Sequence, residues 1–273
     1  MIKKLDHVAV VVRNLDSGLK SLQQALGLPE ARAEVRTTPA VKLTMLPLRN
    51  ARLELFEPLD RESGQGRFLQ TYGEGLYHLC VEVDSVDNSL LSLAERGVPL
   101  SDRVGRSVPI GKIVFLPPQA ARGVSIELLE KKTPDPAGPA DAPALDAVVL
   151  AVANLEDATK TFSKVLDVTP SKVVGDPRVG IRTALLPVGD SFIELAQPTD
   201  PAGPLARFLA KRGEGLYMLT IEVKDFESHR GHLRSKGISI LERETATGRP
   251  VRRWGYLSPK STSGVLIGFF QRD

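Results

Sequence analysis

The chain has 273 residues, of which 42% are hydrophobic and 25% are charged, and its formal net charge is +3. This length is typical of two domains, and the composition excludes a disordered or collagen-like chain. So small a charge, with only 5% aromatic residues, argues against a nucleic-acid partner. No apolar run reaches the ~20 residues of a membrane span, so no membrane partner is expected. The single cysteine cannot form an internal disulfide and favours a reducing, cytoplasmic setting.

The two halves of the sequence repeat one another. Residues 73–79 (GEGLYHL) recur as 213–219 (GEGLYML), and residues 5–8 (LDHV) recur as 145–148 (LDAV). The segment 131–143 (KKTPDPAGPADAP) is rich in proline and small residues, which is typical of a linker. The repeat therefore predicts one domain at 1–130 and a second at 144–273.

A weaker repeat divides each half again, since residues 6–12 resemble 77–83, so we interpret the chain as four modules. Each module begins with a Val-rich strand, continues with an amphipathic helix and ends with shorter strands. The first helix is expected from Leu15 to Leu26, with Asp16 as a possible cap and Gly27 at its end. Further strands are expected at 41–48, 51–57, 76–83, 112–117 and 123–130, and connecting helices at 65–72 and 204–212.

This order of elements predicts an α+β fold. The family resemblance described below implies that four such modules, each βαβββ, pair into two cup-shaped mixed sheets, with the helices on the outer face. Whether the modules pair within each half or across the halves is left open, and pairing across the halves would divide the candidate site described next.

Polar side chains share one face of four expected strands. Residues i and i+2 of a strand point to the same side, so His7 lies opposite the apolar Val8 and Val10. The same alternation places one ionisable residue on the corresponding face of three other strands. These residues are Glu54, His78 and Glu127. If the two N-terminal modules pair about a pseudo-twofold axis, all four converge on one concave surface.

Two imidazoles and two carboxylates that converge are a typical ligand set for a divalent metal ion. The sequence therefore predicts one divalent ion, its identity open among Co, Mn, Ni, Zn, Mg and Fe. Its predicted ligands are His7, Glu54, His78 and Glu127. The alternative is that each is a partly exposed residue on the solvated face of an antiparallel sheet.

The second half serves as an internal control, because it keeps the apolar pattern and loses three of the four ligand types. The equivalent positions hold Ala147, Glu194, Met218 and Gly268. We therefore expect a single metal site, in the N-terminal half. The C-terminal half would replace the second subunit of a homodimer, so the chain is expected to be a monomer with an internal pseudo-dimer, or a homodimer.

The sequence segments that contain these residues resemble those of the vicinal oxygen chelate superfamily of glyoxalases, bleomycin resistance proteins and dioxygenases. The segments are LDHVAV (5–10), LPL (46–48), LELFEPL (53–59), GEGLYH (73–78) and GVSIEL (123–128). The resemblance covers 4–130 and, in degenerate form, 145–270, as a tandem duplication. Within the superfamily, the likeness is greatest to methylmalonyl-CoA epimerase. It implies a divalent metal at the four ligand positions named above, a set that also suits bacterial glyoxalase I.

The resemblance further implies an enzyme, an isomerase, epimerase or lyase, that acts on a small molecule with vicinal oxygens. Both oxygens would chelate the metal, and a proton would leave the carbon next to the chelated carbonyl. Glu127 matches the ligand carboxylate that is thought to act as base in glyoxalase I, and Glu54 is its pseudo-symmetric counterpart. These two are the predicted catalytic residues.

One departure from the family bears on the reaction. The epimerases usually carry Glu-Gln-Gly just before the Leu-Pro-Leu strand, whereas residues 37–41 of this chain read TTPAV. Because that stretch lacks a carboxylate, the second acid/base residue of a two-base epimerase is missing. This favours a one-base isomerisation, a lyase reaction or oxygen chemistry. Two alternatives remain: an Fe(II)-dependent dioxygenase, and a non-catalytic binding or resistance protein.

A second histidine pair lies in the C-terminal half. His229 and His232 stand three residues apart on an expected helix at 226–236, beside Arg230 and Arg234. We interpret them as part of a solvated basic helix face rather than as metal ligands.

Overall fold

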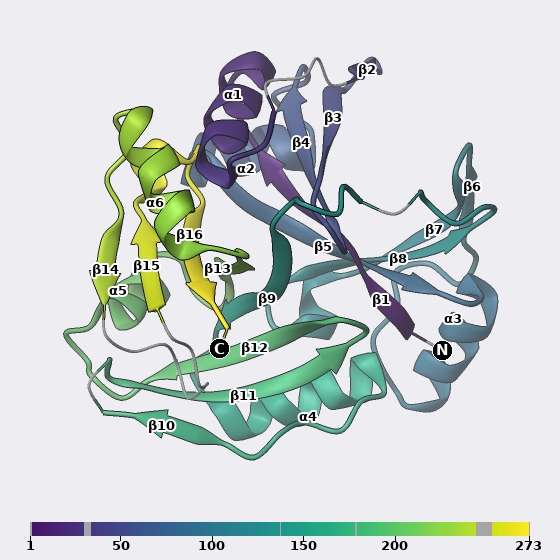
Figure 1. The fold of residues 1–273 in the computed structure, drawn as a ribbon. Coiled ribbons are helices and arrows are strands. Elements are labelled where there is room, and N and C mark those ends of the chain that lie inside the picture. Colours follow the sequence, from purple (N-terminus) through teal and green to yellow (C-terminus); the bar gives the residue numbers. More distant parts are fainter. Residues whose placement is uncertain (1, 30–33, 137, 178, 244–252, 273) are drawn as a thin grey trace. The chain divides into compact units, whose positions relative to one another are not determined.

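The computed structural model describes residues 2–29, 34–136, 138–177, 179–243 and 253–272. Their strands form two curled eight-stranded sheets (Figure 1). The strand order is β2-β3-β4-β1-β5-β8-β7-β6 in the first sheet and β10-β11-β12-β9-β13-β16-β15-β14 in the second. The two orders match once eight is added to each strand number of the first. The predicted fold class is therefore confirmed, and the modules pair strand to strand within each half.

The elements follow the predicted order in all four modules. The strands of the first sheet are β1 Ile2–Val11, β2 Arg36–Thr37, β3 Val41–Pro47, β4 Arg52–Pro58, β5 Gly75–Val83, β6 Arg106–Val108, β7 Gly111–Leu116 and β8 Ser125–Lys131. Those of the second are β9 Ala144–Ala151, β10 Val174–Asp176, β11 Ile181–Val188, β12 Ser191–Pro198, β13 Gly215–Glu222, β14 Leu241–Arg243, β15 Arg253–Leu257 and β16 Leu266–Gln271. The helices are α1 Leu15–Leu26, α2 Gly64–Tyr72, α3 Val86–Glu95, α4 Leu155–Leu166, α5 Pro204–Arg212 and α6 Phe226–Ser235, with short 3-10 turns η1 Pro118–Ala121 and η2 Pro259–Ser261.

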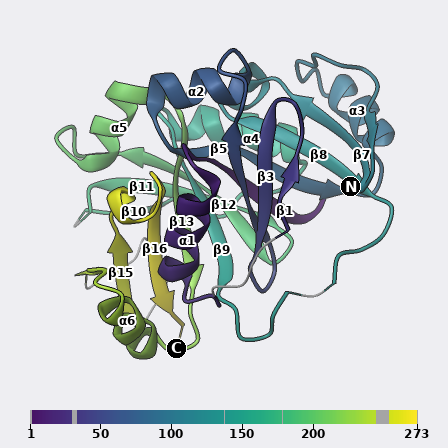
Figure 2. The same ribbon diagram turned by 90° about the horizontal axis from the view of Figure 1, so that it is seen from above.

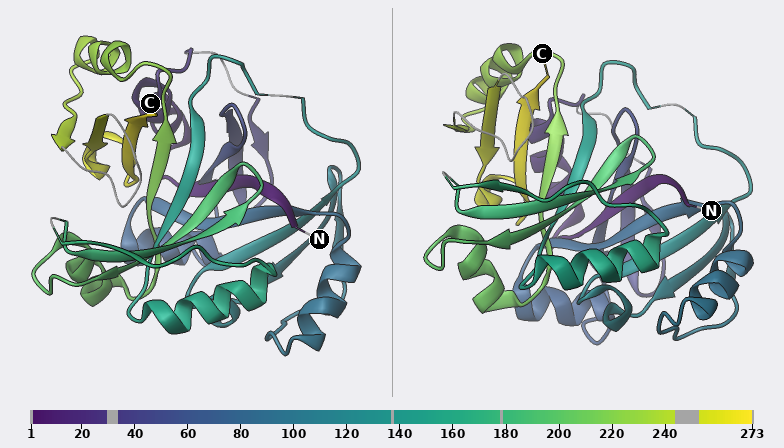
Figure 3. Two further views of the ribbon diagram at one scale, coloured as in Figure 1. Left: turned by 60° about the horizontal axis from the view of Figure 1, so that its bottom comes forward. Right: turned by 90° about the horizontal axis from the view of Figure 1, so that it is seen from below.

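Each module closes on itself through one parallel strand pair. β1 pairs in parallel with β4, and β3 pairs antiparallel with β4. The other modules repeat this pattern, for example in the parallel pair of β5 and β8. Parallel pairing requires a crossover connection, which the module's helix supplies. Each helix contacts strands of its own module, as α4 does with β11 and β12 (Figure 3).

A side chain on the last strand of each module holds the first residue of that module's helix. The backbone N–H of the helix's first residue donates a hydrogen bond to a carboxylate or amide oxygen there. The acceptors are Glu57 (2.8 Å), Glu130 (2.8 Å), Gln197 (2.9 Å) and Gln271 (3.1 Å). This contact satisfies a backbone donor that a helix start leaves open and ties helix to sheet in all four modules.

The cap of α1 differs from the expectation. Asn14, in an extended conformation, accepts from the Ser17 N–H at 2.9 Å, so it is the N-cap, and Asp16 lies in the first turn. A carboxylate in the first turn still interacts favourably with the helix dipole. Gly27 ends the helix in the left-handed conformation, as predicted.

Two compact units, each with one module from each half, make up the chain. The first consists of residues 1–6, 78–136 and 147–217, and the second of 7–77, 137–146 and 218–273. The boundaries fall inside β1, β5, β9 and β13, so these strands continue through both units. The two sheets divide the chain at the linker 131–143, whereas each compact unit contains residues from both sides of it. The division into two domains at this linker therefore stays a prediction.

The repeated word GEGL makes a structural contact in each unit. In one unit, the Glu74 carboxylate accepts from the Arg13 N–H at 2.8 Å, and a Cβ added to Gly264 would lie 2.1 Å from the Glu74 carbonyl oxygen. In the other unit, the Glu214 carboxylate accepts from the Ala153 N–H and from Arg122. The GEGL segment therefore recurs because, in each unit, it joins a module of one half to a module of the other.

Substituting Gly264 tests this close approach. Gly264→Ala combines a left-handed backbone (φ 81°) with a backbone clash, so we expect a loss of unfolding free energy of at least about 3 kcal/mol. Gly237→Ala is the matched control, because Gly237 has φ 73° and nothing within 4 Å of the added Cβ. The control should lose only about 1–2 kcal/mol. Urea unfolding of both variants provides the comparison, and equal losses would contradict the packing argument.

The histidine pair on α6 does not form a solvated face, so that interpretation is wrong. His229 is buried, and its ring packs against Phe269 with the centroids 4.4 Å apart. His232 Nε2 lies 3.0 Å from the Gln24 carbonyl oxygen, and a Cβ on Gly27 would lie 3.4 Å from the His229 ring. The C-terminal end of α1 therefore lies against these histidines, and Figure 2 shows α1 and α6 in the same part of the molecule as β15 and β16. The sequence of α6 alone cannot show this contact.

Burial of His229 has a consequence for stability. Desolvation, together with the neighbouring His232, lowers the pKa of His229 to about 4 from an ordinary value of 6.5. Between these values the unfolded chain binds a proton that the folded chain does not. The free energy of unfolding should therefore fall as the pH drops from about 6.5 to about 4, by about 3 kcal/mol from this group. Urea unfolding at pH 7.5 and 4.5 should show a smaller difference for His229→Leu than for the unchanged protein; an equal difference would contradict the assignment.

Candidate metal centre

The central strands β1 and β5 are buried on both faces. Residues 5–11 of β1 are all buried, as are 78–83 of β5. The four predicted ligands share this burial, with exposed fractions of 2% for His7, 8% for Glu54, 2% for His78 and 7% for Glu127. The alternative of a solvated sheet face is therefore wrong.

The first module brings His7 and Glu54 together. In the parallel register of β1 and β4, Ala9 lies next to Glu54, and His7 stands two residues earlier on the same face. The short Ala9 side chain leaves room for Glu54 to reach diagonally to the imidazole. His7 Nε2 lies 3.2 Å from Glu54 Oε2.

The second module repeats this arrangement with His78 and Glu127. Here Cys80 takes the place of Ala9, since it lies next to Glu127 in the register of β5 and β8. His78 Nε2 lies 3.3 Å from Glu127 Oε2. Phe115, across from Glu127 on β7, presents its edge to the His78 ring with the centroids 5.4 Å apart.

β1 and β5, which carry the two histidines, are neighbours in the first sheet. One ligand atom each from His7, Glu54 and His78 lies within 4.8 Å of the others. Glu127 is not part of this group of three, and it lies 3.3 Å from His78.

The donor set fits a divalent ion. Adjacent ligands of an octahedral ion, each at about 2.1 Å, lie about 3 Å apart, which agrees with the two imidazole–carboxylate distances of 3.2 and 3.3 Å. Two carboxylates would also balance the ion's charge, which matters because buried charges must be compensated. Histidine nitrogen and carboxylate oxygen suit Mn, Co, Ni, Zn and Fe(II).

The equivalent positions of the second half are filled differently. A Cβ on Gly268 would lie 2.8 Å from the indole ring of Trp254, which is itself buried. The indole therefore lies against the position that corresponds to Glu127. Met218 and Ala147 bring no ligand atoms of the predicted kind, and Glu194 remains as a buried carboxylate.

Sequence reasoning missed a buried charge cluster beside the centre. Lys131 Nζ contacts the carboxylates of Asp6 and Asp135, with Glu82 3.6 Å away. The second half repeats it, since Arg272 contacts Asp146 at 2.7 Å and Glu222 at 3.4 Å. The recurrence of Asp6 as Asp146 in the repeated LDHV and LDAV words was the signal that could have revealed it.

A family model decides the affiliation of the chain. The model of the Glyoxalase/Bleomycin resistance protein/Dioxygenase superfamily matches residues 6–115 and again 146–256. The chain belongs to this superfamily. Both matches are needed to account for the two sheets, so the superfamily fold occurs here as a tandem duplication.

Known relatives in this superfamily match about half of the chain. An uncharacterized protein of Bacillus subtilis (strain 168), YqjC, is 30% identical over 132 residues, which are 48% of this chain and 94% of the relative. Human mitochondrial methylmalonyl-CoA epimerase is 30% identical over 127 residues, which are 46% of this chain and 72% of the relative. A mutant of 4-hydroxymandelate synthase from Streptomyces coelicolor covers 100% of this chain and 94% of its own, with a TM-score of 0.77 and 15% identity. That likeness shows a shared four-module fold.

In the part of the chain that the structure describes, no helix is long and apolar enough to cross a membrane.

The two halves supply a matched pair of carboxylates for a binding test. Glu54→Gln replaces a candidate charged ligand and should weaken divalent-metal binding by at least about 10-fold, because even partners outside the ligand shell contribute that much. Glu194→Gln makes the same change at the equivalent buried position of the second half and should leave binding unchanged. Isothermal titration with Mn²⁺ or Co²⁺ measures both. An effect of the second variant equal to that of the first would contradict a single centre in the N-terminal half.

Proposed function

We propose that the N-terminal half is a divalent-metal-dependent enzyme that abstracts a proton next to the carbonyl of a small molecule with vicinal oxygens. The observation that carries this proposal is the pair of buried imidazole–carboxylate contacts in matched places of two modules, at 3.2 and 3.3 Å. The proposed metal ligands are His7, Glu54, His78 and Glu127. A bound divalent ion supplies Lewis acidity, which polarises the carbonyl and acidifies the neighbouring C–H.

Four protein ligands leave two positions of an octahedral ion for the substrate. The His7 and His78 Nε2 atoms, each beside a carboxylate oxygen, would bind the ion together with those carboxylates. The burial of all four side chains excludes bulk water, which strengthens electrostatic interactions with a developing negative charge.

Glu127 is the proposed base. Its carboxylate lies next to His78 and across from Phe115, which is 36% exposed. A base at that place can receive a proton from a substrate that enters beside the Phe115 ring. Glu54 lies at the matching place of the first module and would serve there as a ligand of the ion.

The hairpin at residues 37–41 supports a reaction with one base. Thr38 Oγ1 contacts the Val41 carbonyl at 3.2 Å and accepts from the Ala40 N–H at 3.3 Å, so the hydroxyl is part of the turn. This stretch brings no carboxylate to the sheet. A reaction with Glu127 as the single base, an isomerisation or a lyase step, is therefore favoured over inversion by two bases.

Hydrogen exchange tests the proposal directly. The Co²⁺-loaded protein is incubated in D₂O with methylmalonyl-CoA, the substrate class named by the human relative, and separately with the glutathione hemithioacetal of methylglyoxal. NMR should show deuterium entering at the acidic carbon of one of these compounds, and Glu127→Gln should slow this by at least about 100-fold. The Glu194→Gln variant provides the control and should exchange at the unchanged rate.

The other outcomes identify the alternatives. Exchange together with inversion of configuration would show an epimerase. Oxygen uptake with Fe²⁺ and a catechol, without exchange, would favour a dioxygenase. Tight binding of a small molecule that survives both His7→Ala and His78→Ala would favour a non-catalytic binding protein.

A further inference from the structure

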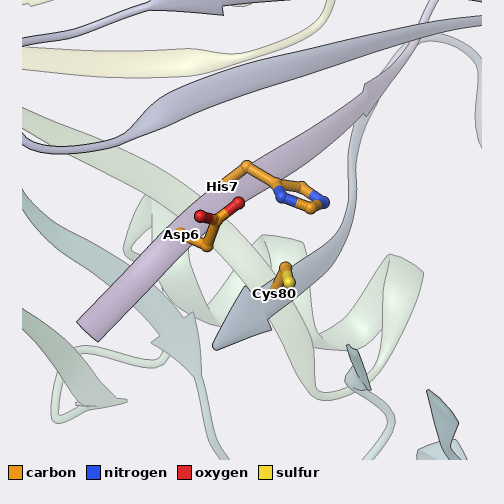
Figure 4. Close-up of side chains that lie close together, drawn as sticks. All are labelled: Asp6, His7 and Cys80. Atoms are coloured by element: carbon orange, nitrogen blue, oxygen red, sulfur yellow. The ribbon is translucent and has the colours of Figure 1, made fainter. Parts of the chain in front are cut away.

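A second group of possible metal ligands overlaps the centre. Within the described residues, ligand atoms of Asp6, His7 and Cys80 lie within 4.8 Å of one another, and all three side chains are buried. Figure 4 shows the Asp6 carboxylate and the His7 ring extending from β1 toward the side on which Cys80 lies on β5. This group shares His7 with the group of His7, Glu54 and His78.

We propose that Cys80 gives the centre a second coordination mode for soft divalent ions, in which Asp6 and Cys80 join His7 around the metal in place of Glu54, His78 and Glu127. Thiolate sulfur binds zinc and the still softer cadmium strongly, whereas carboxylate and imidazole alone suit harder ions such as Mn²⁺. The proposal goes beyond the proposed function, because it requires neither turnover nor binding of a hard ion.

The geometry permits this mode with a small adjustment. Ligand atoms around a tetrahedral zinc ion lie about 3.3–3.6 Å apart, given bonds of about 2.0–2.3 Å. The three side chains would therefore contract by roughly 1 Å from their separation of up to 4.8 Å. Asp6, which contacts Lys131, would supply a carboxylate oxygen to the ion. The Cys80 proton would leave to solvent when the metal binds.

The second half shows that the fold does not require a cysteine here. Thr220 occupies the place of Cys80, since it lies next to Gly268 in the strand register just as Cys80 lies next to Glu127. The Thr220 hydroxyl donates to Asp146, the counterpart of Asp6, at 3.0 Å. The charge cluster is complete in that half without sulfur. The single cysteine of the chain thus stands beside the candidate centre, at a place where the other half has a hydroxyl.

The two modes exclude each other because both need His7. An ion bound by Cys80 and His7 would draw the imidazole away from Glu54, which lies 3.2 Å from it in this structure. Soft ions would therefore displace Mn²⁺ from the centre and act as inhibitors, even though they are divalent.

Cadmium provides a direct optical test, because a cadmium–thiolate bond absorbs in the near ultraviolet and the chain has one cysteine. Titration of the metal-free full-length protein with CdCl₂ should produce this band and saturate at a single equivalent. Cys80→Thr, which installs the residue of the second half, should lose the band and bind Cd²⁺ at least about tenfold more weakly. Cys80→Ala is the second variant if the threonine variant unfolds, and thermal unfolding checks both. Cadmium binding without the band in the unchanged protein would overturn the proposal.

A companion variant separates this proposal from the proposed function. Glu54→Gln should keep the cadmium band while losing Mn²⁺ affinity, because Glu54 belongs only to the hard-ion mode. Loss of the band in a folded Glu54→Gln variant would overturn the second mode. If Mn²⁺ fails to bind the unchanged protein while the band forms, the proposed function fails and the second mode stands.

A competition experiment tests whether the two modes exclude each other. The electron paramagnetic resonance signal of free Mn²⁺ measures how much bound Mn²⁺ is released by Cd²⁺. Cys80→Thr should need at least about tenfold more Cd²⁺ for the same release.

Discussion

Burial of β1 and β5 on both faces is the constraint on which the centre of the N-terminal half depends. A strand presents alternate residues to opposite sides, so the branched residues of these strands pack on one side while His7 and His78 lie on the other. Because that second side is also buried, each polar group on it must find a partner within the protein. The neighbouring parallel strands supply those partners, Glu54 from β4 and Glu127 from β8.

The duplicated halves separate the residues that serve folding from those that serve the centre. Both halves keep a strand side chain at the start of every module's helix, a cation paired with the buried Asp6 or Asp146, and the contact of the GEGL turn with a glycine. Each of these satisfies a buried charge or allows close backbone packing, so its loss would cost stability in either half. Imidazoles stand at the candidate ligand positions in the first half alone, whereas Ala147 and Met218 take these positions in the second, where Trp254 also packs against Gly268. The fold therefore tolerates the loss of the ligands, which is expected when their role is chemical rather than structural.

Local features were predictable from sequence where the physical cause is itself local. Helical spacing and Gly27 located α1, and period-two alternation located the four polar side chains on one face. Asp16 was misplaced because three polar residues, 14, 16 and 17, lie near the helix start, and only the backbone conformation shows which of them is the cap. The solvated face expected for His229 was wrong because α1, about 200 positions earlier in the chain, covers it.

The sequence by itself determined the duplication, the module order, the fold class and the identity of the candidate ligands, because each follows from residue types repeated at regular intervals. Only the tertiary structure decided that the modules pair within each half in the sheets, that the compact units take one module from each half, and that Cys80 and Asp6 lie beside His7. Strand neighbours in a sheet are set by register and packing between distant segments, and neither leaves a periodic trace in the chain. Asp6 shows this most clearly: alternation assigns it to the face opposite His7, yet the pairing of β1 with β5 brings ligand atoms of both within reach of one sulfur atom.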